Sequence, residues 1–133
     1  MKYFKSLVIV ILFSFVLPNK SFAYLSYYKC VFDRGSSSDF DNTPSPEKIK
    51  VPLKLVFEDL DYNNNSGRMV GENGSAEIGL ITTGNINIVE VTPSGNMTVT
   101  TIFLNPKNTY NAVHSRHIDM FGAVVSQYYG ICN

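Results

Sequence analysis

Short runs of alternating apolar and polar residues make up most of the chain from residue 24 onward. The runs are dense in Val, Ile, Thr, Tyr and Phe, which suit a pleated, half-buried surface. Turn residues, above all Gly and Asn, separate them at short intervals. These features predict an all-β sandwich or barrel of about eight strands, at residues 24–32, 53–60, 68–70, 75–82, 85–91, 97–104, 110–118 and 123–129.

Residues 35–52 interrupt this pattern. Their sequence, GSSSDFDNTPSPEKIKVP, is rich in Ser, Asp and Pro and contains few apolar residues. Such a composition predicts a long loop after the first strand.

A repeated turn predicts how the strands are connected. The segments 82–89 and 93–100 share a turn-then-strand shape, with a Gly-Asn pair at Gly84-Asn85 and again at Gly95-Asn96. Gly takes positive φ freely and Asn tolerates it, so each pair suits a reversal between antiparallel strands. The sequence therefore favours a meander of hairpins.

The first 23 residues have the order of a cleavable signal peptide. Lys2 and Lys5 precede an uncharged apolar run at residues 7–17, and small residues lead to a cleavage site after Ala23. The run is about half of the roughly 20 residues that a membrane-spanning helix needs, and no later stretch is longer. We expect a periplasmic or secreted protein with one β domain, residues 24–133, and no stable membrane span after cleavage.

The two cysteines, Cys30 and Cys132, lie near opposite ends of this domain. In an oxidising compartment an even cysteine count most simply means a disulfide. A disulfide requires Cα atoms within about 7 Å, so the first and last strands must meet. In a meander this closes the sheet, and we therefore expect a small antiparallel barrel, lipocalin-like or inhibitor-like, closed by one disulfide.

Charge and motif content narrow the function classes. Three of the eleven basic residues lie in the predicted signal peptide and all eleven acidic residues lie after it, so the mature domain carries a net charge of −3. This argues against nucleic-acid binding, which depends on Lys and Arg. Ser94 lies in Pro-Ser-Gly-Asn, which is turn chemistry rather than a nucleophile elbow. The sequence predicts neither an enzyme nor a bound cofactor.

One strand carries the only two histidines. His114, Arg116 and Tyr110 share one face of the segment 110–118, whereas His117 lies on the other face. The histidines are three residues apart, and no carboxylates with recognisable spacing complete a zinc site. These side chains are either the polar end of a strand or, if they point inward, a site for an anionic small ligand.

A second segment resembles a calcium-binding loop. Asp61, Asn63 and Asn65 supply oxygen side chains at alternate positions, and Glu72 stands at the twelfth place. The glycine comes one place late, the flanks are strand-like, and Asn and Gly are also the residues that turns require. A polar hairpin turn explains the same residues.

In outline the chain resembles the small periplasmic inhibitors of C-type lysozyme, which are exported eight-stranded barrels. Tyr28-Lys29-Cys30 and Cys132 match the Tyr-x-Cys and carboxyl-terminal cysteine of that family. Its inhibitory loop carries Ser-Gly-x-x-Tyr, whereas Ser94-Gly95-Asn96-Met97-Thr98 has threonine in the tyrosine place.

Two functions are therefore expected. The first is a non-catalytic exported binding or inhibitory protein that contacts an extracytoplasmic partner through turns such as the one holding Ser94, Gly95 and Asn96. The alternative is a carrier that holds a small ligand inside the barrel near His114 and Arg116.

Overall fold

A computed structural model describes residues 25–39, 41, 45–105, 109–119 and 121–133, so the predicted signal peptide lies outside the described residues. The described part of the chain forms eight strands: β1 (Tyr28–Ser38), β2 (Glu47–Asp61), β3 (Ser66–Gly71), β4 (Gly74–Thr82), β5 (Ile86–Val91), β6 (Met97–Phe103), β7 (Tyr110–Asp119) and β8 (Ala123–Cys132). Within these residues there is no helix of the length and hydropathy needed to cross a membrane.

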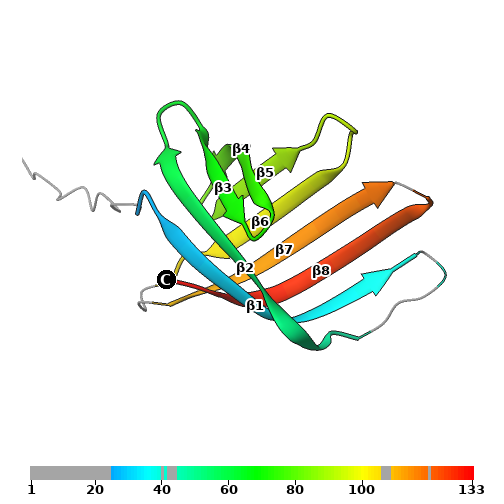
Figure 1. The fold of residues 1–133 in the computed structure, drawn as a ribbon. Helices are drawn as coiled ribbons and strands as arrows, with labels where there is room; N and C mark the ends of the chain where they lie inside the picture. Colours follow the sequence, from blue (N-terminus) through cyan, green and yellow to red (C-terminus); the bar gives the residue numbers. More distant parts are fainter. Residues whose placement is uncertain (1–24, 40, 42–44, 106–108, 120) are drawn as a thin grey trace, which may run out of the picture.

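The eight strands form one closed antiparallel barrel in which each strand pairs with its neighbour in sequence and β1 pairs with β8 (Figure 1). This confirms the predicted all-β meander and its closure. Cys30 and Cys132 lie directly opposite each other on β1 and β8, with Cα atoms 4.0 Å apart, and form the expected disulfide. A disulfide of this kind indicates an oxidising environment outside the cytoplasm.

One end of the barrel is filled with side chains. Tyr28, Phe32, Phe57, Ile86 and Ile102 are almost completely buried there, together with both cysteines. They point inward from β1, β2, β5 and β6 and pack across the barrel axis. This packed end contains the amino-terminal start of β1, the end of β8 and the β4–β5 turn (Figure 1).

Close approach of β1 and β8 depends on a glycine. A Cβ atom at Gly130 would lie 2.0 Å from the carbonyl oxygen of Val31, which no side chain can accommodate. Gly130 pairs with Phe32, next to a register shift at which Asp33 is the extra residue of β1. Such a bulge bends its strand and increases the local twist.

The prediction of a loop over residues 35–52 was wrong for much of its length. β1 continues to Ser38 and β2 begins at Glu47. The end of β1 pairs with β8 from Gly35↔Tyr128 to Ser38↔Val125. Backbone pairing with a distant strand therefore overrides a local composition that carries no apolar alternation.

The other strand ends lie within a few residues of the limits predicted from the sequence. β1 begins at Tyr28 rather than at residue 24, and β8 includes Cys132 instead of ending before it. The two Gly-Asn reversals are confirmed, because Gly84 and Gly95 lie in the β4–β5 and β5–β6 turns with φ of 87° and 86°. In this left-handed region a side chain would be strained.

Candidate functional site

Polar side chains occupy the inside of the barrel towards one end, which we call the mouth; it carries the β3–β4, β5–β6 and β7–β8 turns. Residues directly opposite each other on paired strands point to the same face, so the register defines rows around the interior. The deepest of three successive rows is Phe32, Gly130, Ala112, Ile102 and Ile86. The next is Gly35, Tyr128, His114, Thr100 and Ile88. The row nearest the mouth is Ser37, Ser126, Arg116, Thr98 and Glu90.

The mouth is hollow. A cavity of about 460 Å³ opens there between two walls of different chemistry, and we call it the mouth cavity. The wall from β2, β3 and β4 is largely apolar and includes Leu53, Leu55, Met69 and Ala76. The opposite wall, from β5, β6 and β7, is largely polar and includes Glu90, Thr98, His114 and Arg116.

His114 faces the mouth cavity from the middle row and is only 3% exposed. Its Nδ1 lies 2.7 Å from Oγ1 of Thr100, with which it shares a hydrogen bond. The rings of Phe32 and Tyr128 lie 5.7 and 6.0 Å from the imidazole, centre to centre. Burial, and then the positive charge of Arg116, lower the pKa of His114 to about 4. The imidazole is therefore neutral at pH 7 and acts as a polar, uncharged part of the wall.

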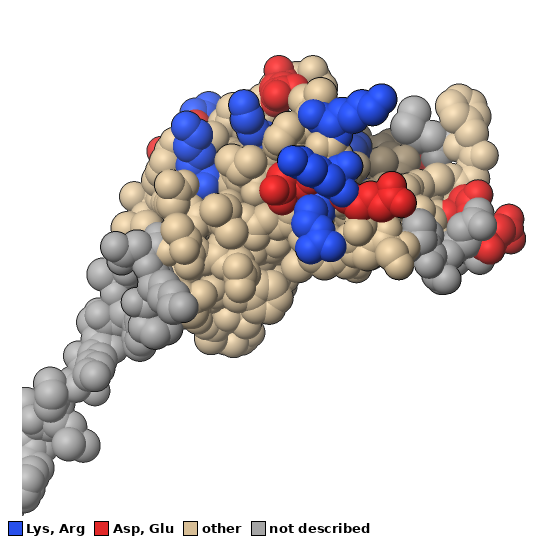
Figure 2. Space-filling view, turned by 90° about the horizontal axis from the view of Figure 1, so that it is seen from below, with Lys and Arg blue, Asp and Glu red and all other residues tan. Residues whose placement is uncertain are grey.

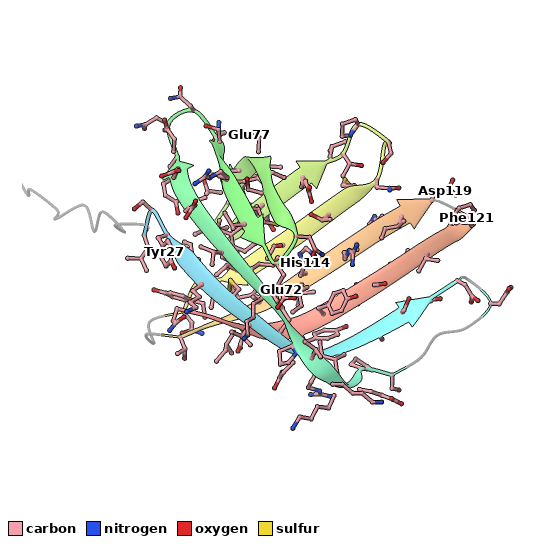
Figure 3. The ribbon with its side chains drawn as sticks, viewed as in Figure 1. Tyr27, Glu72, Glu77, His114, Asp119 and Phe121 are labelled. Atoms are coloured by element: carbon pink, nitrogen blue, oxygen red, sulfur yellow. A yellow bond between two sulfur atoms is a disulfide. The ribbon has the colours of Figure 1, made fainter. Side chains whose placement is uncertain are left out.

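Charged side chains line the mouth cavity nearer its opening. Glu90 and Arg116 flank Thr98 in the outermost row, and Thr98 donates a hydrogen bond of 3.2 Å to Oε2 of Glu90. Glu72, labelled with His114 in Figure 3, lines the cavity from the short β3–β4 turn. In the closed barrel β3 stands four strands away from β7, the strand that carries His114. The mouth cavity thus combines two carboxylates with one guanidinium.

The β5–β6 turn forms part of the rim. Thr92 and Asn96 line the mouth cavity, whereas Ser94 and Gly95 are exposed. The turn is fixed by hydrogen bonds from the amides of Thr92 to Asn96 O (2.9 Å) and of Gly95 to Thr92 O (2.9 Å). Asn96 Oδ1 also accepts a hydrogen bond from the amide of Asp119, which ties the turn to the end of β7.

The structure places the predicted ligand residues in two regions. His114 and Arg116 point inward and line the cavity, as a carrier with a ligand inside the barrel would require. His117 is exposed on the outer face. Tyr110 also points inward but lies at the packed end, where its ring meets Tyr28 edge-on at 6.0 Å between centroids. Tyr110 therefore belongs to the core and not to the cavity.

The four residues of the calcium-like segment do not form one site. Both carboxylate oxygens of Asp61 accept hydrogen bonds within the β2–β3 turn, from the amides of Asn63 and Asn64 and from Nδ2 of Asn64. These bonds lower the pKa of Asp61, the Asn64 amide most. Asn65 lies in this turn with φ of 53°, while Glu72 lies beyond the other end of β3. Six residues of strand span about 20 Å, too far for shared coordination. Among the described residues no cluster of three or more His, Cys, Asp or Glu side chains is placed to hold a metal.

Sequence reasoning missed the other residues of the cavity. Glu90 and Thr98 were not expected to face inward, and Leu53 and Met69 were expected only as strand residues. The sequence did contain one indication that Glu90 faces inward. Glu90 lies at alternate positions with Ile86 and Ile88 along β5, so it shares a face with these two core residues. A carboxylate on the inward face of a strand is costly unless that position is open to water or to a ligand.

Comparisons with models of protein families, with curated proteins and with solved structures find no match to this chain.

Proposed function

We propose that this chain is a non-catalytic exported binding protein that holds a small amphipathic molecule in the mouth cavity. The observation that carries the proposal is the hollow end of a barrel whose other end is tightly packed. Its volume of about 460 Å³ lies within the range of small-molecule sites. The opposed apolar and polar walls suit a ligand with one apolar side and one polar side. The proposal places the protein in the periplasm or outside the cell.

The two walls contribute in different ways. Leu53, Leu55 and Met69 offer apolar surface, and each ligand methylene that leaves water there is worth about 0.8 kcal/mol. Thr98, His114 and Arg116 offer hydrogen-bonding groups that orient the ligand and reject purely apolar molecules. The walls are strands of a closed sheet, so the site is formed before the ligand arrives and loses little entropy on binding.

A second function, binding of a partner protein through the β5–β6 turn, is favoured by one observation. The turn is rigidly hydrogen-bonded, yet Pro93, Ser94 and Gly95 at its tip are exposed. The resemblance to lysozyme inhibitors also concerns this turn. Because Thr92 and Asn96 belong to the rim of the mouth cavity, the two functions predict contacts at neighbouring but distinct residues.

Native mass spectrometry of protein recovered from the cells that export it tests the first function. We expect a fraction of the molecules to carry a bound small molecule of constant mass. Ala76→Trp should abolish this species because the indole would fill the cavity from the apolar wall. The matched control is Glu77→Trp, at the next position of β4, which is exposed. A bound species that survives in Ala76→Trp, or its absence from the wild type, would contradict the proposal.

A further inference from the structure

The charges inside the mouth cavity are arranged as a separated pair. Among the described residues that line it, Arg116 is the one cation, and Glu72 and Glu90 are the carboxylates. Arg116 and Glu90 belong to the same row, on β7 and β5, with Thr98 on β6 between them. Two interstrand spacings place their Cα atoms about 10 Å apart.

Within the described part of the chain, Arg116 forms no ion pair, and the hydrogen bond to Glu90 comes from Thr98. Both charges are therefore presented to the cavity instead of neutralising each other. A charge facing a partly enclosed space is unfavourable unless water or a ligand compensates it. The arrangement of these two side chains is what a ligand has to match.

Most of the other described cations are exposed on the outer face of the barrel and do not line this cavity. Five of the seven Lys and Arg residues that the structure describes lie exposed on β1 and β2, namely Lys29, Arg34, Lys48, Lys50 and Lys54. Figure 2 shows Lys and Arg side chains gathered on one outer face with acidic groups among them. Their charge is screened by solvent over about 8–10 Å, so the field inside the mouth is set by its own residues.

A ligand with a single charge fits this field poorly. The lining carries one cation and two carboxylates, so an anion placed at Arg116 leaves Glu90 uncompensated and also faces Glu72. A cation at Glu90 leaves Arg116 uncompensated in the same way. A ligand that carries both charges can compensate both side chains and still place an apolar segment against Leu53 and Met69.

From this geometry, and resting on the proposed function, we infer that the mouth cavity selects zwitterionic amphipathic ligands, with the anionic group at Arg116 and the cationic group at Glu90. Thr98, between the two, offers its hydroxyl to either end of the ligand. This goes beyond the anionic ligand that His114 and Arg116 alone suggest, because it assigns a role to the inward-facing carboxylate.

Isothermal titration calorimetry of the wild-type protein tests the inference. The three probes have eight carbons each and differ only in their charged groups: octanoate, octylammonium and 8-aminooctanoate. The amine and carboxylate of extended 8-aminooctanoate lie a distance apart comparable to the spacing of the two strands. We expect 8-aminooctanoate to bind about tenfold more tightly than either singly charged probe, since two charge-assisted contacts form in place of one. This comparison needs no variant and so cannot fail through misfolding.

Two variants assign the ends of the probe. Arg116→Gln should weaken 8-aminooctanoate and octanoate and spare octylammonium, while Glu90→Gln should weaken 8-aminooctanoate and octylammonium and spare octanoate. Lys54→Gln, which removes a cation from the outer face, is the matched control and should change none of the three.

Equal affinities for all three probes, or tightest binding of a singly charged probe, would overturn the charge-pair inference while leaving the cavity as a binding site. Binding of none of them would overturn both this inference and the proposed function.

Discussion

Lowering the pH should destabilise this protein through His114. The imidazole is 3% exposed, packs near the rings of Phe32 and Tyr128, and has a pKa lowered to about 4 by burial and by Arg116. In the unfolded chain its pKa is near 6.5. Below pH 6.5 the unfolded state therefore takes up a proton that the folded state does not bind until about pH 4.

The sign and size of the effect follow from this difference. The contribution of neutral His114 is fully present above pH 6.5 and is lost as the pH falls towards 4. Each unit of pKa difference corresponds to 1.36 kcal/mol, so the whole shift is worth about 3 kcal/mol. Between pH 7 and pH 5 the loss should be about 2 kcal/mol, which is a large part of the stability of a small domain.

Urea unfolding followed by circular dichroism between pH 7 and pH 4.5 measures this loss. Other groups also titrate in this range, so the wild type is compared with His114→Gln, which can still hydrogen-bond to Thr100 but cannot become charged. The stability difference between the two proteins should shrink by about 2 kcal/mol from pH 7 to pH 5. His117→Gln, at an exposed position of the same strand, should keep the wild-type acid sensitivity.

Parallel stability curves for wild type and His114→Gln over this range would mean that His114 is not the source of the acid sensitivity. If the glutamine variant does not fold, the NMR titration of the His114 ring in the wild type decides the matter. A ring that titrates near pH 6.5 would mean that the imidazole is not desolvated as the structure indicates.

Three further predictions concern the barrel itself. Replacing Cys30 and Cys132 together by Ala removes the cross-link that closes a loop of about 100 residues, and should lower the free energy of unfolding by about 4–5 kcal/mol in urea titrations. A loss below about 1 kcal/mol would mean that the disulfide does little to stabilise the barrel. Gly130→Ala should reduce the melting temperature sharply or prevent folding, because its Cβ would lie 2.0 Å from a β1 carbonyl oxygen. The control Gly79→Ala should fold normally, because its Cβ would meet nothing nearer than 3.9 Å. Equal melting temperatures for the two variants would contradict the close approach of β1 and β8. Gly95→Ala should cost about 1–2 kcal/mol in urea unfolding because φ is 86°, and an unchanged midpoint would argue against this turn geometry.

Much of the fold could be predicted from the sequence because it depends on local alternation and on one long-range constraint. The Gly-Asn pairs at Gly84 and Gly95 marked the reversals, and the cysteine positions required the first and last strands to meet. The strand at Gly35–Ser38 could not be predicted, since its residues carry no apolar pattern and are held by pairing with β8.

The cavity was harder to predict than the fold. Which of two alternating faces points inward depends on register, and in β6 the inward face holds Thr98 and Thr100 as well as Ile102. Whether inward residues fill a barrel or leave it open depends on the sum of side-chain volumes around a row, and this requires the strand pairing. The sequence did place His114 and Arg116 on one face, which the structure turns towards the cavity.

Mapping of amide chemical shifts during titration with 8-aminooctanoate tests most directly that the hollow mouth of this barrel is a binding site. We expect saturable shifts on both walls at once, at Leu53 and Met69 on the apolar side and at Thr98 and Arg116 on the polar side. Shifts confined to the exposed tip of the β5–β6 turn or to the outer face of β1 and β2, with the cavity residues unmoved, would contradict it.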